Sequence, residues 1–336
     1  MVYKYFSITF LSLIFLLGCT QPRYSRTEFV LGTNCTITIF EDRKESVLVE
    51  QALINAFDRL REIDNLMSVN LPASDISRIN ASAGIEPVRV NKDVFNLITN
   101  SFICYFYSSG AFNPAIGPIV SLWDIDGSNP RVPLQQEIDA ALPLTKFNDI
   151  EFDYDTYSIF LKKQGMSLDL GAIAKGYAAD ETAVILLNAG IKRAIIDLGG
   201  NVIVLGQNPR KKPWRVGIQD PNGQPGDYIR IINVTVDQYY TSIVTSGGYQ
   251  RYFEQDGIRY HHIFSPADGY PVNNELLSVT IISPNSMYAD AYSTAVFVLG
   301  YEKGLEMVNN MPLTEAVFVF KDGSVRTTNR VELITP

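Results

Sequence analysis

The second half of the chain consists of short apolar runs separated by residues that favour tight turns. Asp256-Gly257 and Asp322-Gly323 lie between such runs, and Asp-Gly pairs are typical of β-hairpin turns. In the first half, apolar residues at three- and four-residue spacings over 45–67 predict a helix, and 91–110 favour a second helix ended by Gly110. Helices first and hairpin-connected strands later favour an α+β fold, with mainly antiparallel sheets packed against helices, over a doubly wound parallel sheet.

Four further segments complete this outline. Residues 29–40 alternate like one half-buried strand, and 150–163 have a hairpin pattern. Residues 168–190 run from a strand end into a helix, and 286–300 form the last helix, with Ser286 as its N-cap. No linker divides residues 30–336, so we expect a single domain there.

The N-terminus has the pattern of an export signal. Lys4 precedes an apolar run from Phe6 to Leu17, which is too short for an ordinary membrane span, and Gly18 and Cys19 follow. The LLGC ending resembles a bacterial lipoprotein box, in which Cys19 becomes the lipidated N-terminus, although Leu17 is bulkier than that position usually holds. An ordinary cleaved signal is the alternative.

We therefore expect a lipoprotein signal peptide over 1–18, a tether over 19–29 and one domain over 30–336. The protein would be exported and lipid-anchored to a bacterial membrane, facing the periplasm or the cell exterior.

The charge of the chain limits its partners. The net charge is −8, and removal of Lys4 with the signal makes it about −9. No basic run alternates with aromatic residues, which makes nucleic acid an unfavourable partner, and any bound polyanion would need a cation beside it. Cys35 and Cys104 have neither a metal-ligand spacing nor a CxxC pattern, so two buried thiols or one disulfide both stay open.

One predicted helix carries a candidate cation site. Asp290 and Thr294 are four residues apart and therefore share a face of the helix, among small and apolar neighbours. A buried carboxylate needs a partner, because an unpaired buried charge is costly. The partner is either an Arg or Lys elsewhere, or the favourable first turn of the helix, or a hard cation that takes oxygen ligands from Asp290 and Thr294.

Two loops and the histidines are the other candidates. Asp169 and Lys175 flank a Gly-Ala turn that leads into a helix, where backbone groups can approach a ligand, unless the segment is a simple connection. Glycines and prolines shape the loop over 110–123. His261 and His262 are the only histidines of the chain, and a structural imidazole competes with a catalytic one at this position.

Six segments together resemble the ApbE family, the flavin transferases that move FMN from FAD onto a threonine or serine of a target protein. They are 67–80 (MSVN…SDISRIN), 110–123 (GAFNPAIGPIVSLW), 168–180 (LDLGAIAKGYAAD), 195–206, 245–271 and 289–300. The resemblance runs in the family's order from about Leu31 to the C-terminus. It implies FAD as substrate, Mg²⁺ as cofactor and AMP as the leaving product.

The resemblance also implies site residues. Mg²⁺ would be held by the backbone carbonyl of Ala172 and the side chains of Asp290 and Thr294, with Ser293 lining the site. His262 would assist catalysis, while His261 faces the other side of an extended segment and packs. FAD would be contacted by Leu31, Asn70, Ala111, Phe112, Asn113, Asp169, Lys175, Thr245, Ser246, Gly247 and Phe264.

The acceptor and the type of reaction carry alternatives. The family implies an extracytoplasmic redox protein or ion-pump subunit that presents a D-x-[ST]-G-[AS]-T segment. Asn70 stands where many relatives have Tyr, and Gly248 and Ser265 replace the acidic or amide side chains expected there. The Asn70 departure leaves open an FAD pyrophosphatase that makes FMN and AMP with water as acceptor. A non-catalytic FAD-binding lipoprotein is the third alternative.

Overall fold

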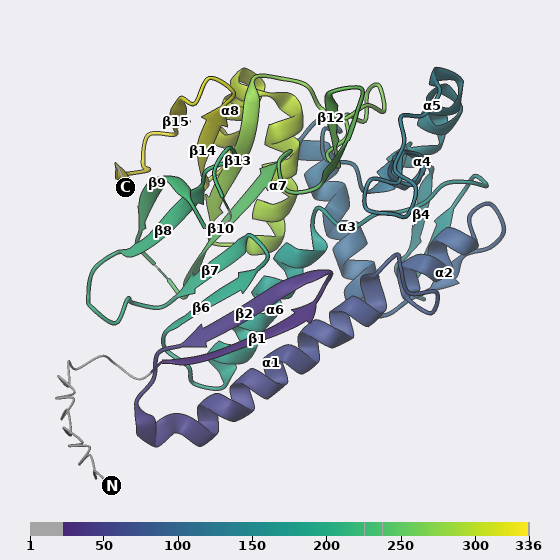
Figure 1. Ribbon diagram of the computed structural model, residues 1–336. Helices are drawn as coiled ribbons and strands as arrows, with labels where there is room; N and C mark the ends of the chain where they lie inside the picture. Colours follow the sequence, from purple (N-terminus) through teal and green to yellow (C-terminus); the bar gives the residue numbers. More distant parts are fainter. Residues whose placement is uncertain (1–22, 225, 237, 335–336) are drawn as a thin grey trace, which may run out of the picture.

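A computed structural model describes residues 23–224, 226–236 and 238–334, and its centre is one eight-stranded sheet (Figure 1). The predicted signal peptide and Cys19 lie outside the described residues. All neighbouring strands are antiparallel, which confirms the predicted fold class. In sheet order the strands are β1 (Tyr24–Val30), β2 (Thr33–Ile39), β6 (Ala194–Leu198), β7 (Asn201–Leu205), β10 (Tyr240–Gly247), β13 (Leu276–Ser283), β14 (Glu315–Phe320) and β15 (Val325–Thr327).

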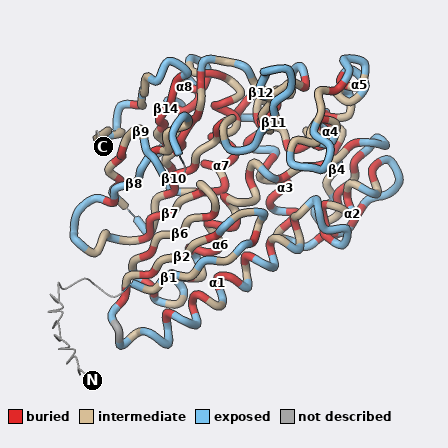
Figure 2. Tube along the Cα trace, viewed as in Figure 1, coloured by how far each residue is buried: buried red, intermediate tan, exposed pale blue. Residues whose placement is uncertain are grey.

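Helices cover one face of this sheet and bury the main core (Figures 1 and 2). Apolar residues three and four apart on α1, including Val49, Leu53, Phe57 and Leu60, point into this core. The layer consists of α1 (Ser46–Met67), α3 (Lys92–Tyr107), α6 (Ala174–Asn188), α7 (Ser286–Leu299) and α8 (Tyr301–Asn309). No helix within the described residues is long and apolar enough to cross a membrane.

A second, smaller sheet covers part of the opposite face. Because side chains alternate along a strand, Val244 of β10 enters the main core while Ile243 joins a second core with Trp214 and Ile232. This second sheet has the order β16 (Leu333–Ile334), β9 (Tyr228–Val234) and β8 (Trp214–Gln219).

A third group of elements lies beside the helices and carries the predicted loop and histidines. Trp123 packs between Phe264 and Tyr260, and its indole donates a hydrogen bond to the carbonyl of Gly269. The β11–β12 hairpin is thereby fixed on α4. The group contains α2 (Asp75–Ala81), α4 (Gly117–Trp123), α5 (Gln135–Ala141), β3 (Val88–Arg89), β4 (Ile150–Asp153), β5 (Ser158–Leu161), β11 (Tyr252–Gln255) and β12 (Ile258–His261), with 3-10 helices at Pro114–Ile116, Leu142–Leu144 and Phe147–Asp149, and a further one at Arg43–Glu45 before α1.

Several predicted elements are confirmed. α1 and α3 lie within the predicted helical ranges, and Ser109 and Gly110 take left-handed conformations after α3. The hairpins at 150–163, Asp256-Gly257 and Asp322-Gly323 are present as β4–β5, β11–β12 and β14–β15. Cys35 and Cys104 are both free and buried, and burial raises the pKa of each thiol to about 12.

The predicted single strand over 29–40 is wrong. Two strands, β1 and β2, pair from Tyr24↔Ile39 to Val30↔Thr33 around left-handed Leu31 and Gly32. The predicted tether over 19–29 is therefore wrong from Tyr24 onward. β1 is an edge strand with one exposed face, so polar residues fill alternate positions and hide the strand signal.

Two helix boundaries also differ from prediction. Residues 168–173 contain no strand: 168–170 have no regular secondary structure and 171–173 form a turn, because the backbone of Asp169 donates to the carbonyl of Pro114 instead of joining a sheet. The predicted last helix, α7, ends at Leu299 and is followed by α8, which starts after Gly300, a residue with a positive φ angle. The N-cap of α7 is Asn285 rather than Ser286, and the Asn285 side chain accepts a hydrogen bond from the Tyr288 N–H.

Candidate functional site

The first turn of α6 meets the N-terminal part of α7 at a glycine. Oδ2 of Asp290, a residue only 3% exposed, accepts the backbone N–H of Gly176 at 2.9 Å, and Nζ of Lys175 lies 3.9 Å from the same oxygen. Gly176 is the third residue of α6, so its N–H belongs to the first turn, whose N–H groups have no partner within the helix. No described residue donates to the Ala172 carbonyl or to Oδ1 of Asp290. Two oxygen acceptors therefore keep their lone pairs.

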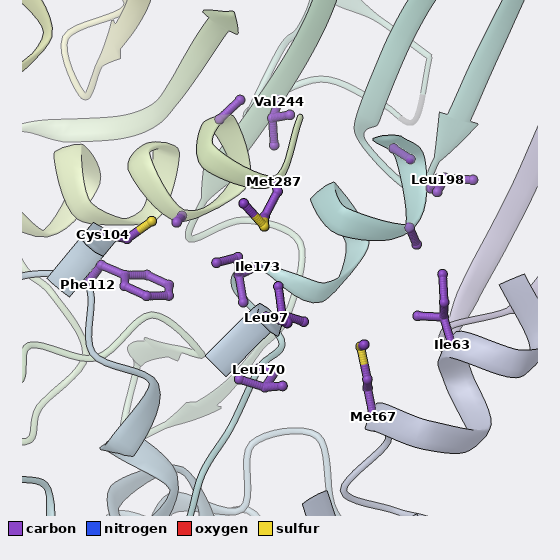
Figure 3. Close-up of a cluster of buried hydrophobic side chains, with 14 of the residues drawn as sticks. Ile63, Met67, Leu97, Cys104, Phe112, Leu170, Ile173, Leu198, Val244 and Met287 are labelled. Atoms are coloured by element: carbon purple, nitrogen blue, oxygen red, sulfur yellow. The ribbon is translucent and has the colours of Figure 1, made fainter. Parts of the chain in front are cut away.

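The turn that presents Ala172 is anchored from below. Leu170 and Ile173, on either side of it, point into the buried cluster that contains Leu97 and Met287 (Figure 3). Burial of these side chains stabilises the turn and leaves the backbone carbonyl of Ala172 as the group that can contact a ligand.

Only glycine permits this contact between α6 and α7. A Cβ at position 176 would lie 2.3 Å from the Ser286 carbonyl oxygen and 2.7 Å from Cβ of Asp290. Gly176→Ala is therefore expected to lower the free energy of unfolding by about 1–3 kcal/mol, because the helices must separate. Urea denaturation measures this change. In a helix with free space around the glycine, the same substitution raises the free energy of unfolding by up to about 1 kcal/mol. An increase in stability of the Gly176→Ala variant would therefore contradict the close packing of α6 and α7.

Asp180 fixes the start of α7, and no sequence pattern of its own marks it as a functional residue. Its carboxylate accepts the N–H groups of Ser286 at 2.9 Å and Met287 at 2.8 Å, and the hydroxyl of Tyr240 donates to it at 2.9 Å. A carboxylate at a helix N-terminus is favourable. Burial nevertheless raises the pKa of Asp180 to about 6. Asp180 closes the 168–180 segment, and its position in that motif was the only sequence signal for it.

A group of hydroxyls lies next to Asp290. Ser246 Oγ of β10 is 2.7 Å from Ser293 Oγ and 3.1 Å from Thr294 Oγ1, both on α7. Ser293 Oγ in turn donates to the backbone carbonyl of Asp290 at 2.8 Å. The strand and the helix thus bring Ser246, Asp290, Ser293 and Thr294 together.

The neighbouring loop is held rigid by its own polar groups. Asn113 Oδ1 accepts from the Ala115 N–H, and its Nδ2 donates to the carbonyl of Thr145. Asp169 Oδ1 accepts the Gly171 N–H, and Lys175 Nζ donates to the Gly171 carbonyl at 3.1 Å. The backbone N–H of Asp169 donates to the Pro114 carbonyl at 2.8 Å, so the 110–118 loop and the segment that leads to Ala172 lie against each other.

His262 has one ring nitrogen committed. Its Nδ1 lies 3.1 Å from the carbonyl oxygen of Arg251, and a carbonyl only accepts, so Nδ1 carries the proton. No described residue bonds Nε2, which keeps its lone pair. Burial, with smaller contributions from the charges of Arg251 and Lys175, lowers the pKa of His262 to about 3. The imidazole is therefore neutral at physiological pH, with Nε2 available as a base.

His261 is committed on both nitrogens. Nε2 donates to the Val272 carbonyl at 2.9 Å, Nδ1 accepts the Ile263 N–H, and the ring packs edge-on against Phe297. A Cβ at Gly248 would lie 2.5 Å from this ring. The lack of space for a side chain beside His261 explains why glycine replaces the acidic or amide residue expected at 248.

Several predicted flavin contacts are not available as side chains. Phe112 is buried in the main core and Phe264 is buried against Trp123. Thr245 bonds Thr280 on the sheet face opposite to Ser246, because successive side chains alternate. The Thr245 side chain therefore points away from α7, and a flavin contact at this residue stays a prediction.

The remaining predicted residues have no hydrogen bond to the Asp290 group within the described residues. They are Leu31, Asn70, Ala111 and Gly247. Asn70 is exposed after α1, and its backbone N–H donates to Ser68 Oγ. A Cβ at Gly247 would lie 2.9 Å from the Leu277 carbonyl, so this strand end admits only glycine.

The chemistry of the group fits a hard cation. It offers a carboxylate, a hydroxyl and a backbone carbonyl, which are the oxygen ligands that Mg²⁺ and Ca²⁺ prefer. The described residues contain no group of three or more His, Cys, Asp and Glu side chains that could hold a metal ion, so the candidate ligands here are one carboxylate, a hydroxyl and a backbone carbonyl. Lys175 adds a positive charge at the same place.

Comparison with known proteins shows the family to which the chain belongs. The model of the ApbE family matches residues 31–318. FAD:protein FMN transferases from Treponema pallidum and Klebsiella pneumoniae are 37% and 38% identical to the chain over 316 and 303 residues. These alignments cover 90% of this chain, and 86% and 90% of the two relatives. The crystal structure of an ApbE protein from Thermotoga maritima matches with a TM-score of 0.80 at 32% identity, covering 91% of this chain and 96% of that one. The chain belongs to the ApbE family.

Proposed function

We propose that this chain is a Mg²⁺-dependent FAD:protein FMN transferase. It would cleave the diphosphate of FAD, join FMN by a phosphoester bond to a Thr or Ser hydroxyl of an acceptor protein, and release AMP. The observation that carries the proposal is that Ala172 O, in the turn before α6, and Asp290 Oδ1, on α7, have no hydrogen-bond partner among the described residues, while Thr294 lies one helical turn after Asp290. Relatives 37–38% identical over most of the chain bear this activity in their names.

Mg²⁺ would be held by Asp290, Thr294 and the Ala172 carbonyl, and when bound it supplies charge stabilisation for the phosphates as the P–O–P bond breaks. Lys175 holds a second positive charge 3.9 Å from Oδ2 of Asp290. These positive charges offset the net charge of −8, which would otherwise repel a diphosphate.

His262 Nε2 would take the proton of the attacking hydroxyl. The oxygen of that hydroxyl bonds to the FMN phosphorus, the bond from that phosphorus to the bridging oxygen breaks, and the electron pair leaves with AMP. The hydrogen bond from Nδ1 to the Arg251 carbonyl fixes the tautomer that leaves Nε2 free. General-base help of this kind is typically worth about 10²–10⁴ in rate.

The identity of the acceptor protein is inferred from the family resemblance. We propose an extracytoplasmic redox protein or ion-pump subunit with a D-x-[ST]-G-[AS]-T segment as acceptor. We also propose that the chain is exported and anchored by lipid on Cys19, since residues 1–19 have a signal pattern. The predicted lipid is testable by metabolic labelling with palmitate: a Cys19→Ala chain would lose the label.

One measurement separates the three alternatives. The lipid-free mature chain is incubated with FAD and Mg²⁺, with and without an acceptor that carries the segment, and AMP, free FMN and acceptor mass are followed. A mass gain of one FMN on the acceptor, with little free FMN in its absence, supports the transferase. Steady AMP and FMN with no mass gain would identify a pyrophosphatase, and exposed Asn70 would be the residue to change next. Tight FAD binding without AMP would identify a binding protein.

A further inference from the structure

Three hydroxyls and one carbonyl form a chain of hydrogen bonds from α7 to β10 and back. Ser293 Oγ lies 2.8 Å from the Asp290 carbonyl oxygen, Ser246 Oγ lies 2.7 Å from Ser293 Oγ, and Thr294 Oγ1 lies 3.1 Å from Ser246 Oγ. Ser293 is fully buried. Each hydroxyl has a single proton to donate.

The carbonyl end of this chain determines the direction of every bond. A carbonyl cannot donate, so the proton of Ser293 must point at the Asp290 carbonyl. Ser293 then accepts from Ser246, whose own proton is used in that bond. Ser246 therefore accepts from Thr294, because neither other proton is available for the 3.1 Å contact.

These directions determine where the hydroxyl proton of Thr294 points. Its proton points at Ser246, so both lone pairs of its oxygen are directed elsewhere and it presents no donor. A hydroxyl in this state is suited to bind a cation, whereas a freely rotating hydroxyl directs its proton at the cation for part of the time.

We infer that Ser246 and Ser293 are positioning residues that hold the Thr294 hydroxyl as a pure acceptor for a divalent cation. The inference rests on the proposed magnesium site, and it changes the predicted role of both serines. Ser293, predicted to line the metal, and Ser246, predicted to contact FAD, act through Thr294 instead. Partners that orient metal ligands typically contribute about 10- to 100-fold to metal affinity.

The test measures binding of Mn²⁺ alone to the full mature chain by electron paramagnetic resonance, with Mg²⁺ by calorimetry as a second readout. Ser246→Ala is expected to weaken binding by about 10- to 100-fold. Ser246→Thr, which keeps the hydroxyl, restores affinity. Ser242→Ala is the matched control, since Ser242 is buried on the same face of β10 and its hydroxyl has no partner among the described residues.

A double variant tests whether the hydrogen bonds run in series from Ser293 through Ser246 to Thr294. Because Ser293 acts only through Ser246, Ser293→Ala is expected to weaken binding in the native background and to add nothing when Ser246 is already Ala. Independent, additive losses would overturn the relay and make Ser293 a ligand in its own right.

Two failures are distinguishable. If the native chain binds Mn²⁺ and Ser246→Ala binds it as tightly as Ser242→Ala does, the relay is wrong and the metal site stands. If the native chain binds neither ion, the magnesium site of the proposed function is wrong, and the role of the serines falls with it.

Discussion

Asp290→Asn is expected to lower AMP release from FAD in Mg²⁺ by on the order of 10²- to 10⁴-fold, because metal stabilisation of developing charge is worth several kcal/mol and about 1.4 kcal/mol is tenfold. Asn is close to isosteric with Asp, so its carbonyl oxygen can still accept the Gly176 N–H that joins α6 to α7. The substitution removes the negative charge of the side chain and replaces the Oδ1 acceptor by an amide NH₂ group. Chromatographic quantitation of AMP over a range of Mg²⁺ concentrations measures the loss.

Asp290→Ala is the comparison that separates chemistry from structure. It removes the Gly176 hydrogen bond as well, so we expect it to lose both activity and stability, whereas Asp290→Asn loses activity with an almost unchanged free energy of unfolding. High activity in the Asn variant would show that no cation depends on this carboxylate. The ion pair with Lys175 or the helix position would then account for Asp290, as the sequence alternatives allowed.

The parts of the fold that were predictable from sequence are those with a local signal. The helices over 45–67 and 91–110 have sustained apolar periodicity, and the Asp-Gly pairs determine two hairpins. β1 was missed because its exposed face makes the segment polar, and α4 and α5 are only seven residues long, so their periodicity is weak. Apolar packing around Trp123, rather than helix propensity, stabilises α4 and α5.

The site shows the same division. Asp290 and Thr294 were found because a spacing of four residues brings them to one helix face. Their partners were not found, because Gly176 is 114 residues from Asp290 in the chain and Ser246 is 48 residues from Thr294. The free carbonyl of Ala172 is likewise a tertiary effect: Ala172 precedes α6, in a segment held by the hydrogen bond from the Asp169 N–H to the Pro114 carbonyl.

His262→Ala is expected to lower the rate of FMN transfer by about 10²–10⁴ while FAD affinity changes little, because the imidazole acts on the acceptor hydroxyl and not on the cofactor. Single-turnover kinetics with labelled FAD, together with equilibrium FAD binding, measure the two quantities. The matched control is His261→Ala, since His261 packs against Phe297 and is expected to lose stability rather than intrinsic rate. Equal losses of rate and FAD affinity in His262→Ala would indicate a structural histidine.

The pH dependence follows from the neutral state of His262. Burial lowers the pKa of His262 to about 3, so in the free protein the base stays unprotonated as the pH falls from 8 to 5. We expect kcat/KM, which reports the free enzyme, to change little over this range, whereas a histidine with an ordinary pKa near 6.5 would lower kcat/KM by about 30-fold at pH 5.

The stability of the protein depends on the same proton. In the unfolded chain His262 binds it below about pH 6.5, so the unfolded chain then binds more protons than the native state. The stability contribution of His262 is consequently full above that pH and falls as the pH decreases towards 3. Thermal unfolding of native and His262→Gln chains between pH 8 and 5 should show the native chain losing more stability on acidification. A loss of kcat/KM centred near pH 6.5, without that difference in stability, would mean that the imidazole is solvated and not held neutral by burial.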